Sequence, residues 1–314
     1  MILLLQYTII FASVLMLVAL GGCFAERSGV INIGLEGIMV IGALGGALVM
    51  KFMPISVGAP VMVMTTILAS ALLGMLFSLL LAVAAIHFKA DQTITGTAMN
   101  MLATAGATVA VKAMNTAASQ GNDVSSDIVY THTKDLLLVR LGNFEFNWFM
   151  LVAALCLVVS FVALYKTKFG LRLRACGEHP QAADSVGINV YKMRYAGVLI
   201  SGLLGGLGGI VYITAGVSVW KFENGVAGFG FLAMAVMIFG GWHPLRIALA
   251  SLLFGFCRAL GNVYSGFDVL AALNIPSVVY NMLPYIISLV VLAFTSKKSM
   301  GPKAAGVPYD KGTR

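Results

Sequence analysis

Long apolar runs are the feature that most restricts how this chain can fold. Residues 2–24 and 149–164 contain no charged side chain, and a helix needs about 20 apolar residues to cross a bilayer core. The chain is 60% hydrophobic and only 10% charged, whereas a soluble domain is about half apolar and a quarter charged. A transmembrane barrel would instead alternate over segments of about ten residues. We therefore predict an all-α, polytopic transmembrane helical bundle.

The apolar runs predict about nine spans within a single transmembrane domain, residues 1–296, followed by a tail, residues 297–314. The run 227–241 is short and bounded by glycines, which indicates a broken or re-entrant helix. The tail carries Gly, Pro and Lys, and we expect it to be unstructured. The predicted spans are 3–24, 33–50, 60–86, 93–111, 149–165, 195–214, 227–241, 247–264 and 279–296.

The distribution of basic residues predicts how the chain is oriented. If residues 166–194 lie in the cytoplasm, alternation of the spans places 14 of the 20 Lys and Arg residues inside and 6 outside. Basic residues concentrate in cytoplasmic loops. We therefore expect the N-terminus outside and the C-terminus in the cytoplasm. The net charge of +8 belongs to these loops, and we expect no nucleic-acid partner.

The sequence contains no arrangement typical of an enzyme or a metal site. It has no phosphate-binding GxxxxGK[ST] motif and no CxxC spacing, and its four cysteines are far apart. Such cysteines are typical of small buried apolar residues. We expect no catalytic residues, no metal and no cofactor in this chain. If ATP drives its activity, ATP and Mg²⁺ must bind a separate ATPase chain.

Two polar residues, Asn32 and Glu36, lie four positions apart on one face of an otherwise apolar segment. A carboxylate within a membrane is costly and rarely faces lipid. Glu36 is therefore either a group that lines or gates a solute pathway, or a helix cap or interhelical hydrogen-bond partner.

Four further residues are candidates for a solute pathway. Thr97 and Asn100 belong to a polar stripe in the span 93–111, which could bind a polar solute or pack against another helix. Phe229 and Phe231 follow glycines at the start of the short run 227–241. They could stack on a ring-shaped solute or pack in the core.

The one strongly charged loop, residues 166–194, is also rich in small residues. Glu178, His179 and Pro180 predict a helix start, because proline suits a first turn. Residues 182–186 would form this short helix, and Gly187 would end it. Such a helix suits docking to a cytoplasmic partner, whereas a merely solvated loop would not need so many small residues.

The same loop resembles the cytoplasmic coupling loop of ABC importer permeases of the branched-chain amino acid/ribose-type superfamily. The pattern G-x-x-x-R-A-x-G-x-x-x-x-A-A-x-x-x-G-I matches residues 170–188, and the segments 28–37, 228–233, 239–244 and 253–255 agree with the same family. Residues 32–37, 91–100 and 228–244 are most similar to permeases for nucleosides or simple sugars.

The resemblance implies a permease subunit in a bacterial cytoplasmic (inner) membrane, which forms the pathway of an ATP-driven nucleoside importer. Its partners would be a homologous permease, an ATPase subunit and an extracytoplasmic solute-binding protein, besides membrane lipid. We expect Glu178→Arg or Gly177→Trp to uncouple the ATPase. The residues that would form the ATPase-coupling surface are Gly170, Arg172, Arg174, Ala175, Gly177, Glu178, Ala182, Ala183 and Gly187.

Other functions remain open at this point. The permease could carry simple sugars or branched-chain amino acids. A different class is an ion-coupled secondary transporter, which would need ionisable groups inside the membrane. The candidates for such groups are Glu36, Arg258 and Asp268.

Overall fold

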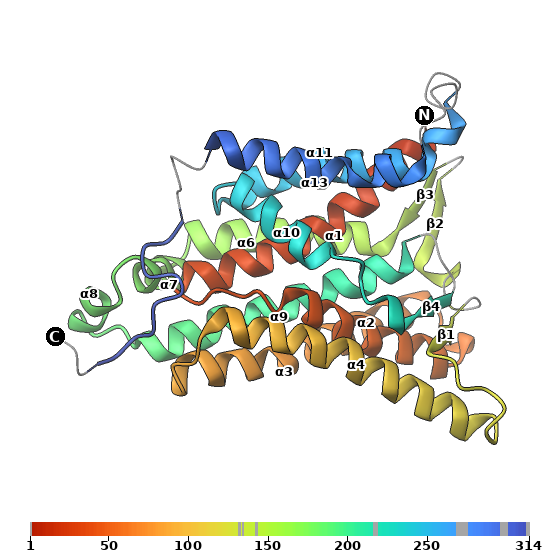
Figure 1. Cartoon of the computed structure of the whole chain (residues 1–314), viewed down its shortest axis with the longest axis horizontal. Coiled ribbons are helices and arrows are strands. Elements are labelled where there is room, and N and C mark those ends of the chain that lie inside the picture. The colour runs from red at the N-terminus through yellow and green to blue at the C-terminus, as the bar shows by residue number, and fades with distance from the viewer. Residues whose placement is uncertain are drawn as a thin grey trace.

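The computed structural model describes residues 2–130, 133, 135–141, 144–215, 219–267, 276–295 and 301–311. Most of them lie in long helices that run side by side, with short strands at one end (Figure 1). The long helices are α1 (Ile2–Arg27), α2 (Leu35–Phe52), α3 (Ala59–Ala82), α4 (Gln92–Ala118), α6 (Trp148–Tyr165), α9 (Val190–Thr214), α11 (Pro244–Val263) and α13 (Ser277–Thr295). Shorter helices are α7 (Lys168–Glu178), α8 (Pro180–Ser185) and α10 (Phe229–Phe239).

The predicted helical bundle is confirmed. Eight helical segments in the described part of the chain are long and apolar enough to cross a membrane, and α13 matches the ninth predicted run. The α3 segment ends in a π-helical turn, η2 (Val83–His87). The helix predicted at 93–111 continues to Ala118.

Helix α9 forms the centre of the bundle and packs against α1, α2 and α3. Its glycines permit this close packing, because they have no side chain to hold the backbones apart. Close packing matters here, since lipid offers no hydrophobic force to drive helices together. A Cβ atom on Gly209 would lie 2.9 Å from the Met39 Cα atom, and one on Gly205 would lie 2.9 Å from the Ile38 side chain. The glycine-dense face of α9 is therefore a packing surface.

The two ends of the bundle differ in structure. One end carries two antiparallel strand pairs, β1 (Asp127–Val129) with β4 (Val219–Lys221) and β2 (Leu138–Leu141) with β3 (Phe144–Asn147). Single turns precede or follow several elements: η1 (Ile55–Val57), η3 (Asp135–Leu137), η4 (Phe222–Asn224) and η5 (Tyr264–Gly266). The opposite end carries α7, α8 and the end of the chain (Figure 1).

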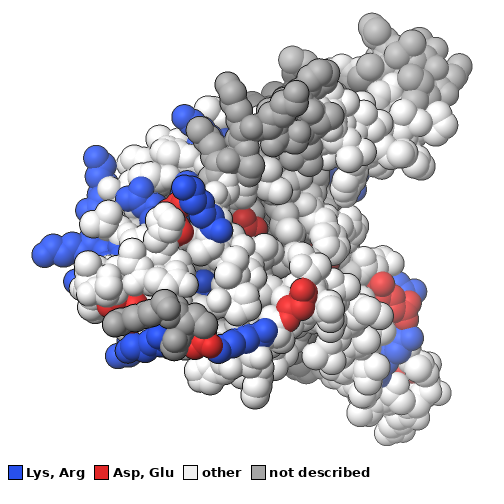
Figure 2. All heavy atoms as spheres, turned by 60° about the vertical axis from the view of Figure 1, so that its left-hand side comes forward, with Lys and Arg blue, Asp and Glu red and all other residues white. Residues whose placement is uncertain are grey.

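Basic side chains gather at the α7–α8 end, which faces forward in Figure 2. Among the described residues, the basic side chains of Lys112 and Lys221 at the strand end pair with Glu223, whereas most of those around α7 and α8 stand without such pairing in Figure 2. The exposed basic residues described there are Lys89, Lys166, Lys168, Arg172, Lys192, Arg246, Lys303 and Lys311.

The expectation of an unstructured tail is wrong for residues 301–311. This segment lies against the α7–α8 end of the bundle, and Pro302, Ala304 and Tyr309 are buried there. It has no helix or strand, so its conformation depends on contacts with distant parts of the chain. Residues 297–300 and 312–314 lie outside the described residues.

Candidate functional site

The charged loop folds into two helices, α7 and α8, which meet at His179. Thr167 caps α7, because its hydroxyl accepts a hydrogen bond from the Gly170 amide at 3.2 Å. Pro180 lies in the first turn of α8, as predicted. Gly187 follows α8 with φ of 83°, a conformation that glycine adopts at little cost. The sequence therefore predicted α8 correctly but did not anticipate α7.

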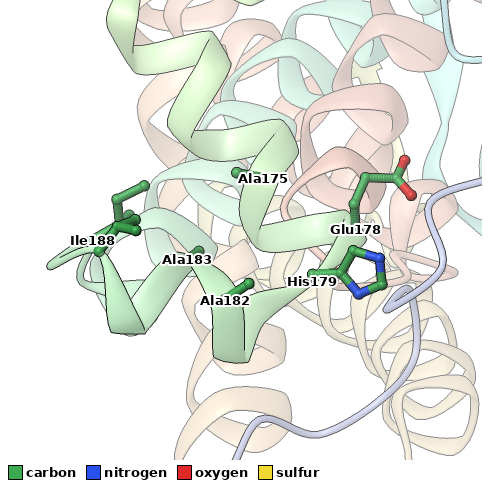
Figure 3. A pocket seen from close by; sticks show the side chains of 7 residues that line it. Ala175, Glu178, His179, Ala182, Ala183 and Ile188 are labelled. Carbon is green, nitrogen blue, oxygen red and sulfur yellow. The ribbon is translucent and has the colours of Figure 1, made fainter.

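A hollow of about 240 Å³ opens between α7 and α8. Figure 3 shows the alanines of both helices around it, with Glu178 and His179 at one side. Val186 is 74% exposed at this hollow, which leaves a large apolar side chain in water. The lining residues are Ala175, Glu178, His179, Ala182, Ala183, Val186 and Ile188.

Four of the nine predicted coupling residues line the hollow: Ala175, Glu178, Ala182 and Ala183. Arg172 is exposed beside them. Arg174 instead packs over the Tyr165 ring, with its guanidinium carbon 4.5 Å from the ring centroid. His179, Val186 and Ile188 also line the hollow, although none of the three is among the nine predicted residues.

The predicted glycines of this loop have structural roles. A Cβ atom on Gly170 would collide with the Ala163 and Leu164 carbonyl groups. A Cβ atom on Gly177 would collide with the Arg27 carbonyl group at the end of α1. An indole at this position would displace α7 from α1, so loss of coupling in Gly177→Trp would not by itself assign Gly177 to the ATPase contact.

The loop is also tied to the rest of the bundle by charge. Arg27, the last residue of α1, lies 3.8 Å from the Glu178 carboxylate and donates a hydrogen bond to the Trp242 carbonyl oxygen at 3.2 Å. The neighbouring carboxylate of Glu26 accepts a hydrogen bond from the Trp242 indole at 2.6 Å. The end of α1 therefore connects α7 with the turn between α10 and α11.

Glu36 caps the broken helix. Its carboxylate accepts hydrogen bonds from the Gly228 amide at 2.7 Å and the Gly230 amide at 2.6 Å. Gly228 has φ of 80° and precedes α10, so the chain turns sharply there and leaves helix-end amides without carbonyl partners. A carboxylate at a helix N-terminus also suits the helix dipole. Of the two interpretations of Glu36, the geometry supports the cap.

Asn100 stabilises the backbone at the start of α2, and Asn32 joins the segment between α1 and α2 to α9. Asn100 accepts a hydrogen bond from the Gly37 amide at 2.7 Å and donates one to the Ile33 carbonyl oxygen at 3.0 Å. Asn32 is buried and donates to the Ser201 hydroxyl at 2.9 Å. Non-helical backbone inside a membrane needs partners such as Asn100. The side-chain carbonyl oxygen of Asn32 is buried and has no hydrogen-bond partner among the described residues.

The remaining pathway candidates separate into buried and exposed residues. Phe229 is 1% exposed and packs on Phe11 and Tyr212, which supports the core-packing interpretation. Thr97 is exposed, and Phe231 is 48% exposed. Glu36 and Asn100 are partly exposed, so Asn32 and Phe229 are the two candidates that are buried.

Arg258, which the sequence suggested only as an ion-coupling group, lies close to the start of α10, where Glu36 forms the cap. The Arg258 guanidinium carbon lies 5.6 Å from the Phe229 ring centroid, and its Nη1 atom donates a hydrogen bond to Asn281. The Tyr285 hydroxyl donates to the Ala227 carbonyl oxygen at 3.3 Å. The intramembrane charges described here therefore hold helices together. Asp268 lies outside the described residues.

The described residues contain no group of three His, Cys, Asp or Glu side chains arranged to hold a metal ion. Three of the four cysteines are buried, as expected, whereas Cys156 is only half-buried. Burial raises the pKa of the Cys176 thiol to about 11, so it remains a protonated, apolar group.

The structure is therefore a polytopic helical bundle with a broken helix at its core and a hollowed, basic loop at one end. The profile of the family described as "Branched-chain amino acid transport system / permease component" matches residues 4–294. The chain belongs to this family, and the resemblance inferred from its motifs is confirmed.

Several curated proteins are similar over nearly their whole length. The guanosine ABC transporter permease protein NupQ of Bacillus subtilis is 43% identical over 98% of this chain and 96% of its own. The nucleoside ABC transporter permease protein NupC of Lactococcus lactis is 40% identical over 96% and 95% of the two chains. NupB of the same organism, also a nucleoside ABC transporter permease protein, is 24% identical over 96% and 82%. No solved structure gave a significant match.

Proposed function

We propose that this chain is a permease subunit of an ATP-driven importer that carries nucleosides across the membrane. The observation that carries the proposal is its 43% and 40% identity, over nearly full length, to a guanosine and a nucleoside permease. Such similarity in chains of equal extent favours a nucleoside over a simple sugar or a branched-chain amino acid. The chain has no catalytic role in this proposal, and ATP hydrolysis belongs to a separate subunit with its Mg²⁺.

A second, different permease is the proposed partner within the membrane. Lactococcus lactis has two nucleoside ABC transporter permease proteins, NupB and NupC, and this chain is similar to both at 24% and 40% identity. A pair of related but unequal chains is therefore the arrangement that these relatives favour. A solute-binding protein would deliver the nucleoside from the outer side.

We place the α7–α8 end in the cytoplasm and the strand pairs outside. The support is the group of basic side chains around α7 and α8 (Figure 2), because Lys and Arg residues are enriched in the cytoplasmic loops of membrane proteins. In this orientation α1 begins outside. The ATPase would then contact the hollow of α7 and α8, where Val186 and the surrounding alanines offer it an apolar surface.

The function is tested by uptake in proteoliposomes that contain this permease, the proposed second permease, the ATPase and the binding protein. We expect these vesicles to take up radiolabelled guanosine only when ATP is present on the side of the membrane that carries the ATPase. Excess unlabelled nucleoside should compete, whereas ribose and leucine should not.

Each alternative predicts a different result in the same assay. If ribose or leucine competes and nucleosides do not, the transported solute is a sugar or an amino acid rather than a nucleoside. Guanosine uptake by this chain without the ATPase, driven by an ion gradient, would replace the importer mechanism itself.

Reversal of charge at the hollow tests the coupling surface. Glu178→Arg should lower ATP-driven uptake by about tenfold or more. A reversed charge at the interface with the ATPase would lose its complementary partner and oppose docking. The side chain is 40% exposed, so the folded permease should persist. Glu178→Gln separates the effect of losing the Arg27 contact from that of the new positive charge.

The matched control is Arg246→Glu, which reverses an exposed charge at the start of α11. We expect its uptake to stay near that of the unmodified permease. Wild-type uptake in Glu178→Arg would remove the assignment of α7 and α8 as the coupling surface.

A further inference from the structure

The end of the chain, residues 301–311, lies across the same end of the bundle that carries α7 and α8 (Figure 1). It connects parts of the chain that are far apart in sequence. The Ala304 amide donates to the Gly177 carbonyl oxygen at 2.8 Å, the Gly306 amide donates to the Gly29 carbonyl oxygen at 3.3 Å, and Arg194 donates to the Val307 carbonyl oxygen at 3.0 Å.

Tyr309 anchors this segment in an apolar cluster. The residue is 4% exposed, and the cluster contains Cys176 of α7, Ala183 of α8 and Val190 of α9. Its ring also meets Tyr191 edge to face, with 5.3 Å between centroids, a favourable geometry for aromatic pairs. One tail side chain therefore packs against both helices of the docking loop and the start of α9.

Arg194 is the second anchor. The residue is 1% exposed, yet its Nε and Nη2 atoms have no hydrogen-bond partner among the described residues. A buried guanidinium without a paired carboxylate is unfavourable unless other groups compensate. The compensating groups are the Val307 carbonyl oxygen and the face of Tyr309, whose centroid lies 6.0 Å from the guanidinium carbon. Both belong to the tail.

Two ion pairs extend the attachment at the surface. Lys89, in the turn before α4, lies 2.6 Å from Asp310, and Lys311 lies 4.0 Å from Asp184 of α8. The Lys89 and Asp310 side chains are 42% and 47% exposed. Exposed pairs contribute little stability, so the anchors are Tyr309 and Arg194.

The contacts join the docking loop to the segment that precedes α2. Gly29 lies in the irregular segment 28–34 that leads to Glu36, the cap of α10, and Gly177 lies in the last turn of α7. A tail bonded to both provides a direct connection between a partner-binding surface and the broken helix at the core.

We propose that residues 301–311 are a positioning strap, held by Arg194 and Tyr309, that transmits movement of the α7–α8 loop to the segment 28–34. This inference rests on the proposed importer function. Without the strap, the loop should still bind the ATPase, but its movement should reach the core less completely. The strap is thus a coupling element and Arg194 and Tyr309 are positioning residues.

The test uses the complete importer in proteoliposomes and measures nucleoside imported per ATP hydrolysed. A ratio of this kind does not change when less protein folds. In a chain that ends at residue 300, and in Tyr309→Ala, we expect the complex to assemble and hydrolyse ATP. The ratio should fall by about fivefold or more, the lower end of ordinary coupling between sites.

Two variants complete the design. Tyr309→Phe keeps the ring and should retain the ratio, and Lys303→Ala changes an exposed strap residue and should also retain it. An unchanged ratio in both the shortened chain and Tyr309→Ala would overturn the strap, as would a loss confined to the amount of complex. If the shortened chain does not assemble, Tyr309→Ala decides the result.

Failure of the strap and failure of the cargo proposal are distinguishable. Absence of guanosine uptake by the unmodified complex would count against the cargo alone. The strap would then be measured by the increase in ATP hydrolysis on addition of the binding protein, which the Tyr309→Ala complex should have lost and the Tyr309→Phe complex should have kept.

Discussion

Glu36→Ala is expected to destabilise the permease and abolish uptake. The carboxylate is the acceptor for the amides of Gly228 and Gly230, and alanine would leave both donors without it. Each buried unpaired donor costs roughly 1–3 kcal/mol, and loss of the negative charge at the start of α10 adds to this. Thermal unfolding in detergent and uptake in proteoliposomes measure the two effects.

Two variants show whether the cap is responsible. Glu36→Gln keeps one acceptor oxygen but loses the charge, so its unfolding temperature should lie between those of the unmodified chain and Glu36→Ala. Glu223→Gln removes an acidic group whose pair with Lys112 is exposed, and its effect should be small. A Glu36→Ala protein with unchanged unfolding but no uptake would contradict the structural cap and restore the interpretation of Glu36 as a solute-pathway group.

Gly209→Val is expected to prevent stable packing of α9. A Cβ atom at this position would lie 2.7 Å from the Met39 carbonyl carbon and 2.9 Å from its Cα atom. Because the obstacle is backbone, α2 and α9 would have to separate. Overpacking typically costs about 1–3 kcal/mol and more where the neighbour cannot move. The yield of folded permease and its unfolding temperature should both fall sharply.

Gly106→Val provides the matched control within another membrane helix. A Cβ atom on Gly106 meets nothing within 4 Å, so valine should be tolerated in the isolated chain. Equal losses of yield and unfolding temperature in the two variants would show that glycine acts through helix conformation rather than through the α2–α9 contact.

The sequence predicted the membrane spans well because each span depends on its own composition. All nine predicted runs correspond to helices, and the short run at 227–241 is the broken α10. The start of α8 at Pro180 and its end at Gly187 were also predictable, since helix ends depend on a few neighbouring residues. Helix α7 was not predicted, because its start depends on a single capping residue, Thr167, which is a weak local signal.

The roles of individual polar residues were less predictable. A carboxylate in an apolar segment is compatible with both a pathway and a cap, and its partners at Gly228 and Gly230 are 192 and 194 positions away. Gly177 matched a coupling motif, but the reason for glycine there is the nearby end of α1. The contribution of Arg258 likewise depends on rings from two other helices.

The sequence by itself determined that this chain is a helical membrane protein, where its spans lie and which family its motifs resemble, because hydrophobic length and local motifs are carried by consecutive residues. Only the tertiary structure decided that Glu36 caps α10, that α7 and α8 enclose a hollow and that the tail lies as a strap on Arg194. These features depend on hydrogen bonds and close contacts between segments that meet only after the helices pack.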